Sequence, residues 1–364
     1  MRSMSKSQEP TVKDGYPLPL KAPFPYFGGK SKVASVVWER LGNVDNYVEP
    51  FGGSLAVLLA RPHEHKWWEK KESAGDYSGH VVNFYRSIAH SPEEVAKFAS
   101  GIVNEADLTA RHLFLVRYNN ELAEELAADP LFFDARAAGW WIWGISCWIG
   151  GDWMTGAGPW KPGANGTPEE IKKALGVYRK MPMVAGSHGG KGIHKPIGKL
   201  EIDPALGFPN LEEAYYENIK SLFTLLSNRL RRVRLTCGDW SRLTGAAMDA
   251  GKGKITGVFL DPPYDLSMRR EDLYSSDKEK DNAVPLSKQS RDWALSKGSD
   301  LSYRIAYCSY YTEEEEVLFL AEGWSPYHWS AQGGYGLQAS NIARDNKDLE
   351  IIWFSPACLS PLSK

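Results

Sequence analysis

The stretch Thr256-Gly-Val-Phe-Leu-Asp-Pro-Pro-Tyr264 joins an apolar run of β type to an abrupt stop. Proline fixes φ and has no N–H to give to a sheet, so the strand is expected to end at Asp261. The side chains of Asp261 and Tyr264 would then stand at the carboxyl end of a sheet, where ligands bind in open α/β folds. Asp-Pro is also common in plain turns, and a loop without a site remains the alternative.

Length and composition indicate a globular α/β protein. The 364 residues suffice for one large domain with an insertion, or for two domains. The net charge of −2 argues against a protein that coats nucleic acid by charge alone, although it leaves room for a local basic face. The four cysteines form no C-x-x-C pair, so neither a zinc site nor a disulfide framework is expected.

Nothing in the sequence predicts export or membrane insertion. Residues 1–14 are polar and do not read as a signal peptide, and we expect residues 1–19 to form a disordered tail. The longest uncharged apolar stretch, residues 137–151, is too short to span a bilayer. We therefore expect a cytoplasmic protein that binds no membrane.

Two glycine-rich stretches predict close approach of the backbone to a ligand. Tyr26-Phe-Gly-Gly-Lys30 precedes a helix-like run, and its N–H groups and ammonium would suit a carboxylate or a phosphate. Glu49-Pro-Phe-Gly-Gly-Ser54 joins a short strand to an apolar helix, as in nucleotide- and cofactor-binding units. It lacks the G-x-G-x-x-G spacing of dinucleotide sites. A plain structural turn is the alternative for each.

Asp76 follows the second expected strand. An acid at this place commonly accepts hydrogen bonds from ribose hydroxyls. The alternative is a helix N-cap, because residues 81–88 are helix-like, although Ser78 would serve that purpose as well.

Taken in order, these motifs resemble those of Dam-type DNA adenine-N6 methyltransferases, which use S-adenosylmethionine (SAM). The matching stretches are Tyr26–Lys30, Glu49–Val57, Asp76 and Asp261–Tyr264, and residues 303–308 and 350–356 are similar to phage and prophage members. The resemblance runs from residue 23 to residue 356. In one departure, relatives often have Phe-x-Gly-x-Gly, whereas Leu55 occupies the last glycine position here.

The resemblance implies SAM as cofactor and S-adenosylhomocysteine as product. No metal is expected, because no set of metal ligands clusters in the sequence. In the family, an acid and an aromatic residue contact the adenine of SAM, and Asp239 and Trp240 match that pair. The cofactor-binding residues implied in this way are Tyr26, Phe27, Gly28, Gly29, Lys30, Glu49, Pro50, Phe51, Gly52, Gly53, Ser54, Asp76, Asp239 and Trp240.

The expected fold is α/β: a Rossmann-like SAM-dependent methyltransferase sheet with an inserted, mainly helical target-recognition domain. The sheet domain is assigned to residues 20–95 and 227–364, and the DNA-binding insertion to residues 96–226. We expect residues 265–300 to form a flexible loop over the site. Late strands are expected at 301–310 and 349–354, with a helix beginning at 313–320 between them.

The insertion offers two kinds of candidate DNA contact. Residues 137–153 contain five tryptophans, which predict either a buried helix or an aromatic platform near DNA. Residues 156–200 carry an excess of lysine and arginine that suits phosphates, although a solvated loop is the alternative. The DNA-binding candidates are Lys161, Lys191, Lys195, Arg229, Arg231 and Arg232.

The predicted catalytic residues are Asp261, Pro262, Pro263 and Tyr264. An adenine amine has its lone pair delocalised into the ring, so an enzyme must draw the amine hydrogens into acceptors and hold the nitrogen in line with the methyl group. The Asp261 side chain and the Pro262 carbonyl would be those acceptors, and Tyr264 would stack on the base. The base must leave the duplex to reach them.

The function expected is site-specific methylation of adenine N6 in double-stranded DNA. Cytosine-N4 methylation uses the same acceptor logic and stays open, as does a non-catalytic DNA-binding protein with this fold. The recognition sequence and the biological role, in restriction–modification or in phage genome protection, do not follow from the motifs. We expect a monomer in solution, with a dimer left open.

Overall fold

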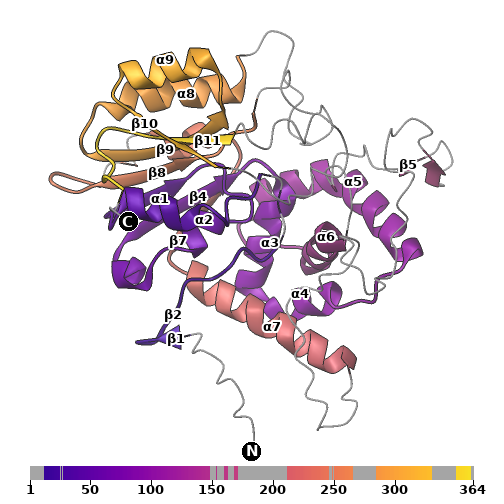
Figure 1. The fold of residues 1–364 in the computed structure, drawn as a ribbon. Helices are drawn as coiled ribbons and strands as arrows, with labels where there is room; N and C mark the ends of the chain where they lie inside the picture. Colours follow the sequence, from indigo (N-terminus) through magenta and orange to yellow (C-terminus); the bar gives the residue numbers. More distant parts are fainter. Residues whose placement is uncertain are drawn as a thin grey trace, which may run out of the picture.

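The molecule is organised around one large sheet with helices on both faces (Figure 1). The computed structural model describes residues 12–24, 26, 28–147, 153, 160–162, 168–170, 211–245, 248, 250–264, 284–329 and 350–361. Of residues 160–162 and 168–170 only the backbone is described.

Seven strands form this sheet, in the order β10-β11-β9-β8-β3-β4-β7. Their bounds are Asn46–Glu49 (β3), Lys71–Asp76 (β4), Val233–Cys237 (β7), Thr256–Leu260 (β8), Tyr303–Tyr310 (β9), Ser325–His328 (β10) and Glu350–Phe354 (β11). The pairs from β7 to β9 are parallel, and β11 runs antiparallel to β9 and β10. A mostly parallel sheet covered by helices confirms the predicted α/β class.

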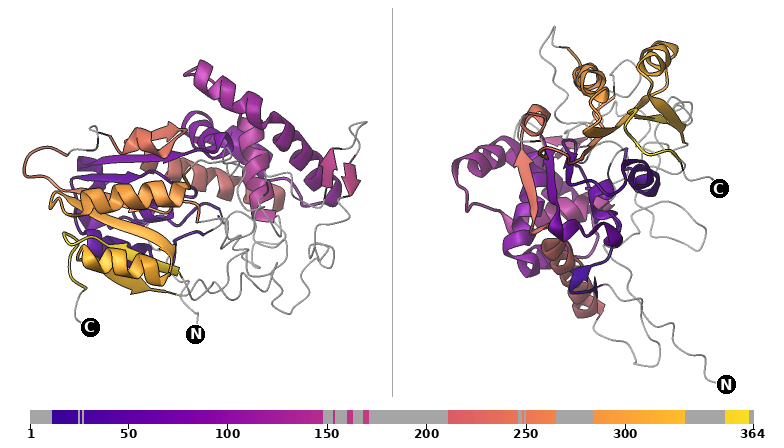
Figure 2. Two further views of the ribbon diagram at one scale, coloured as in Figure 1. Left: turned by 90° about the horizontal axis from the view of Figure 1, so that it is seen from above. Right: turned by 90° about the vertical axis from the view of Figure 1, so that its left-hand side faces the viewer.

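The helices form two groups, on opposite faces of the sheet (Figures 1 and 2). On one face lie α8 (Leu286–Gly298), α9 (Glu313–Ala321) and the short η5 (Trp240–Leu243). On the other lie α1 (Ala34–Leu41), α2 (Ala56–Leu59), α3 (Gly79–His90), α4 (Pro92–Ala99), α5 (Glu105–Ala128), α6 (Ala135–Cys147) and α7 (Leu211–Leu230). Two further 3₁₀ turns are His63–His65 and Trp67–Glu69.

Alternating side chains of the central strands explain the two faces. In β8, Val258 and Leu260 pack with Ala294 of α8 and Phe319 of α9, whereas Phe259 belongs to the core on the other face. Successive side chains of a strand point in opposite directions, and a strand that is buried on both sides needs apolar residues at each position. That requirement accounts for the continuous apolar run before Asp261.

The prediction of a disordered tail over residues 1–19 is wrong for its last part. There, Val12–Lys13 (β1) and Tyr16–Pro17 (β2) form a short antiparallel pair of strands. The Tyr16 ring stacks on Trp68 at 4.2 Å, and a ring nitrogen of His63 lies 3.1 Å from the Lys13 carbonyl oxygen. These contacts hold the pair against the body of the protein. Residues 1–11 lie outside the described part of the chain.

The tryptophan-rich run is mainly core. Trp141, Trp143 and Trp153 are each at most 2% exposed, and Trp140 is half-buried. A Cβ on Gly144 would lie 2.0 Å from the Trp153 ring, so only glycine lets that ring seat against α6. The buried-helix interpretation is confirmed for Trp141 and Trp143 of α6, and Trp153 is buried beside that helix; residues 148–152 are not described.

The helical group packs on the sheet domain along α3, which contacts α5, α6 and α7. α4 begins at Pro92, before the predicted boundary at residue 95, and α7 runs across the boundary at residue 226. Since these helices share one core with α3, the domain limits stay a prediction. A small ribbon of Trp160–Pro162 (β5) and Pro168–Glu170 (β6) completes the described insertion.

The region after β8 is more ordered than predicted. Residues 286–298 form the helix α8 instead of the flexible loop expected over 265–300. Ala294 of this helix is buried against the sheet, and the Ser290 hydroxyl donates to the Leu286 carbonyl oxygen. Residues 265–283 lie outside the described part. The predicted late strands and the helix between them are confirmed as β9, β11 and α9. None of the described helices has the length and apolar character needed to cross a bilayer.

Candidate active site

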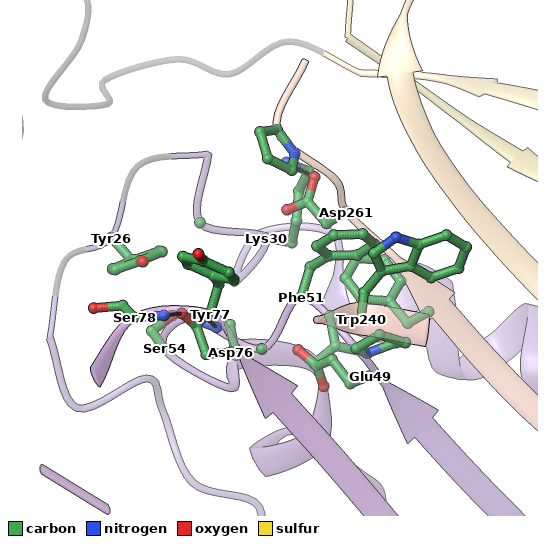
Figure 3. A pocket seen from close by; sticks show the side chains of 18 of the residues that line it. Tyr26, Lys30, Glu49, Phe51, Ser54, Asp76, Tyr77, Ser78, Trp240 and Asp261 are labelled. Atoms are coloured by element: carbon green, nitrogen blue, oxygen red, sulfur yellow. Dashed lines mark hydrogen bonds and ion pairs between the residues drawn. The ribbon is translucent and has the colours of Figure 1, made fainter. Parts of the chain in front are cut away.

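A pocket opens at the carboxyl ends of the parallel strands β3, β4, β7 and β8 (Figure 3). The predicted site residues that line it are Tyr26, Gly29, Lys30, Glu49, Pro50, Phe51, Gly52, Gly53, Ser54, Asp76, Asp239, Trp240, Asp261 and Pro263. Gly28, Pro262 and Tyr264 lie directly beside this lining in the chain, and Phe27 lies outside the described residues. The strand order therefore brings together motifs that are far apart in the sequence.

Asp76 ties two loops of the pocket together. Its Oδ2 accepts a hydrogen bond from the Gly53 N–H and its Oδ1 one from the Ser78 N–H, both at 2.8 Å. The Gly52 N–H also donates to the Gly75 carbonyl at 2.7 Å. Burial raises the pKa of Asp76 although the two hydrogen bonds oppose the shift. The glycine-rich loop after β3 is thus fastened to the end of β4.

The backbone of this loop explains its glycines and the departure at Leu55. Gly53 has a φ of +48°, and a Cβ there would lie 2.6 Å from the Tyr26 ring. Leu55 has a φ of +53°, in the left-handed region where relatives often carry glycine. A side chain in that region costs about 1–2 kcal/mol, which the buried Leu55 offsets by packing in the core.

Glu49 is enclosed at the floor of the pocket. Its Oε2 accepts hydrogen bonds from the Tyr47 hydroxyl at 2.9 Å and from the Leu58 N–H at 3.0 Å. Burial raises the pKa of Glu49 to about 8 in spite of these donors. The carboxyl group is therefore mainly protonated at neutral pH.

Aromatic side chains line the part of the pocket beside β7. The rings of Phe51 and Trp240 stack with centroids 5.8 Å apart, and Trp293 of α8 meets Trp240 edge-on. Asp239 caps η5 by accepting a hydrogen bond from the Ser241 N–H at 2.9 Å, and its side chain is exposed. A flat apolar group with a polar edge would fit beside these residues.

Lys30 is directed at Asp261 from the opposite side. Its Nζ lies 2.9 Å from Asp261 Oδ1 and donates to the Gly28 carbonyl oxygen at 2.6 Å, and Lys30 is only 2% exposed. Burial lowers the pKa of Lys30, but the carboxylates of Asp261 and Glu350 outweigh it and raise the pKa above its ordinary value. The sequence suggested that Lys30 would face a carboxylate or a phosphate. In the structure this anion is the carboxylate of Asp261.

Tyr264 closes this corner. Its hydroxyl donates to Asp261 Oδ1 at 3.1 Å, and its ring lies 4.5 Å from that of Tyr310 with a tilt of 58°. Burial raises the pKa of the Tyr264 hydroxyl well above the ordinary value, and the nearby Asp261 adds to the shift. The hydroxyl is therefore a neutral donor to Asp261.

Several pocket residues were not singled out by the sequence. Tyr77, which is 66% exposed, and Leu286 of α8 both line the pocket, as do Trp141 and Ile145 of α6. The position of Tyr77 directly after Asp76 was an available signal. The other three enter the lining only through tertiary packing.

The fold buries one of the DNA-binding candidates and leaves two others exposed. Arg229 is 1% exposed, and its guanidinium binds both carboxylate oxygens of Glu72, at 2.6 and 3.0 Å, while packing over the Trp67 ring. It is not available to DNA, and that prediction is wrong. Arg231 and Arg232 are exposed. The side chain of Lys161 and the whole of residues 191 and 195 lie outside the described part.

Residues 26–132 match a family model described as D12 class N6 adenine-specific DNA methyltransferase. The match covers the two glycine-rich motifs, Asp76 and the helices from α3 to α5, and it ends before α6 and β8. No curated protein matches the chain. The resemblance read from the ordered motifs is confirmed by this family match.

Proposed function

We propose that the protein is an adenine-specific DNA methyltransferase similar to the Dam type, which transfers the methyl group of SAM to N6 of an adenine flipped out of duplex DNA. The observation that carries the proposal is the pocket that runs from the glycine-rich loop to Asp261. It combines places for a cofactor with an acceptor carboxylate in one continuous lining.

The residues of the pocket fit the cofactor. Gly53 lets the glycine-rich loop lie directly against the Tyr26 ring, which a Cβ at this position would meet at 2.6 Å. Phe51 and Trp240 would pack against the adenine of SAM, and the exposed Asp239 carboxylate would accept its exocyclic amine. When bound, SAM supplies a methyl group activated by a positively charged sulfur.

The hydrogen bonds of Asp261 support its role toward the target base. Oδ1 is taken by Lys30 and Tyr264, and no described residue donates to Oδ2. Two fixed donors on one oxygen would hold the carboxylate so that Oδ2 accepts a hydrogen of the adenine amine. The carbonyl oxygen of Pro262 would accept the other, and the nitrogen lone pair would turn toward the methyl group.

The base must reach Asp261 from outside the double helix. Asp261 is 18% exposed and lies within the pocket, so an adenine still stacked in a duplex would not reach its carboxylate. Tyr264 and Tyr310 would offer ring surfaces to the extruded base.

The test uses plasmid DNA from a host without adenine methylation, incubated with labelled SAM. Digestion to nucleosides and mass spectrometry should find N6-methyladenine with the wild-type protein. Asp261→Ala should lower turnover by at least roughly 10²-fold, since one preorganised acceptor is lost, while SAM is still bound in calorimetry. N4-methylcytosine as product, or unchanged turnover in Asp261→Ala, would refute the assignment.

A further inference from the structure

The charged groups at Lys30 include more carboxylates than cations. Its buried ammonium faces two carboxylates: Asp261 at 2.9 Å and Glu350, whose Oε2 lies 3.7 Å from Nζ. With all three groups ionised, the cluster carries one net negative charge. Lys30 by itself would neutralise Asp261, and Glu350 restores the negative charge at this end of the pocket.

Glu350 has few other partners for its charge. It is the first residue of β11, its side chain is 9% exposed, and its Oε2 is buried without a hydrogen-bond partner among the described residues. Lys30 is also the only described cation that pairs with it. Burial raises the pKa of Glu350, and the ammonium of Lys30 opposes that shift. A carboxylate held this way costs stability, so packing alone does not explain it.

The other ionisable groups of this corner do not supply negative charge. Burial raises the pKa of the Cys308 thiol and of the Tyr264 hydroxyl well above their ordinary values. Both are neutral near pH 7. Glu49, with a pKa of about 8, is mainly neutral as well. The net charge beside the reacting amine therefore depends on Asp261, Lys30 and Glu350.

Methyl transfer moves positive charge from the sulfur of the cofactor toward the amine nitrogen of the base. A net negative cluster beside that nitrogen stabilises the transition state more than the ground state, whereas a neutral ion pair does so weakly. In a buried site the charge of a group several ångströms away still contributes, because little water screens it.

We propose that Glu350 is a positioning residue of the methyl transfer, which holds Lys30 at Asp261 and keeps the cluster negatively charged beside the amine. The inference rests on the proposed function. It gives β11 a role in the reaction, and it explains a buried carboxylate that the cofactor pocket itself does not use.

The experiment compares side chains of equal size that differ in charge. Single-turnover methylation of adenine-unmethylated plasmid DNA is measured with excess enzyme and saturating SAM near pH 7. Glu350→Gln should lower the rate roughly tenfold, the order expected for one lost charge at an effective dielectric of about 20. The Kd for SAM should stay unchanged. Glu350→Asp, which keeps the charge but packs less well, should be faster than Glu350→Gln.

A structural role predicts the opposite order, because glutamine matches the shape of glutamate and aspartate does not. Equal rates for the wild type and Glu350→Gln, or a slower Glu350→Asp, would overturn the proposal. If Glu350→Gln does not fold, the rate of Glu350→Asp is compared with that of Glu350→Asn, which has the same size but no charge. Equal rates for these two variants would also overturn the proposal.

Glu315 of α9 is the matched control. Among the described residues, its Oε2 is likewise buried without a hydrogen-bond partner and its paired cation is Arg291 at 3.9 Å, outside the pocket lining. Burial raises the pKa of Glu315. Glu315→Gln should leave the rate unchanged. A wild-type protein that forms no N6-methyladenine would refute the proposed function itself, whereas an active wild type with an equally active Glu350→Gln refutes only this inference.

Discussion

Glu49 shows how strongly the fold alters a single residue of the pocket. Its carboxyl group accepts two hydrogen bonds, yet burial raises its pKa from 4.5 to about 8. A carboxyl group with a higher pKa in the folded state binds its proton more tightly there than in the unfolded chain. Between these two pKa values the unfolded state loses the proton first, and stability falls as the pH rises.

Glu49→Gln should therefore raise the melting temperature, and the gain should grow from about pH 4.5 to pH 8. Glutamine keeps an oxygen that can accept from Tyr47 and Leu58, and it has no charge to bury. Melting followed by circular dichroism over this range checks the prediction. The exposed Glu64→Gln is the control, and a gain independent of pH would contradict the assignment of the effect to Glu49.

At the scale of elements, the loop between β3 and α2 sets the shape of the cofactor pocket. Gly53 approaches Tyr26, and Asp76 of β4 holds the Gly53 N–H. The loop is thus fixed on both sides before any ligand binds. The positive φ at Leu55 is a local cost that neighbouring packing outweighs, whereas Gly53 adopts its positive φ without that cost.

Gly53→Ala should weaken SAM binding by at least roughly tenfold, because the new Cβ would displace the Tyr26 ring and strain a φ of +48°. Isothermal titration calorimetry with SAM measures the loss. Gly251→Ala is the control, since Gly251 also has a positive φ but meets nothing within 4 Å at its Cβ and lies away from the pocket lining. A similar loss of SAM affinity in both variants would show that strain alone is responsible.

At the scale of the whole molecule, buried ion pairs connect the helical group to the sheet. Glu72 of β4 binds Arg61 as well as Arg229 at the end of α7, and all three side chains are at most 1% exposed. The chain enters α7 from the insertion and leaves it into β7, so this cluster fixes where the insertion rejoins the sheet domain.

Arg229→Ala should destabilise the protein by about 3–5 kcal/mol, since it leaves the Glu72 carboxylate short of a buried partner. Its affinity for DNA per folded molecule should be unchanged. Arg232→Ala, at an exposed position, should leave stability within about 0.5 kcal/mol. Urea unfolding and a DNA-binding titration measure the two quantities, and a loss of DNA affinity in folded Arg229→Ala would restore that residue as a DNA contact.

The order of motifs and the elements around them could be predicted from the sequence. Proline ends β8 at Asp261, glycines permit the loop after β3, and an apolar run marks a strand buried on both faces. These features depend on neighbours in the chain, whose local chemistry is the same in any fold. The same reasoning indicated the α/β class, the placement of Asp76 and Asp261 at the ends of strands, and the helix α9, whereas Asp239 followed from the family resemblance.

Which charged side chains pair with one another was decided only by the tertiary structure. Lys30 meets Asp261 and Glu350, and Arg229 turns inward to Glu72 instead of toward DNA. Both outcomes depend on strand order and helix packing, which set which face of an element is buried. A cation that loses water must find an anion nearby, and only the assembled fold determines which anion is within reach. The sequence by itself thus determined the chemistry available at Asp261, and the packing of β8, β9 and β11 decided which charges surround it.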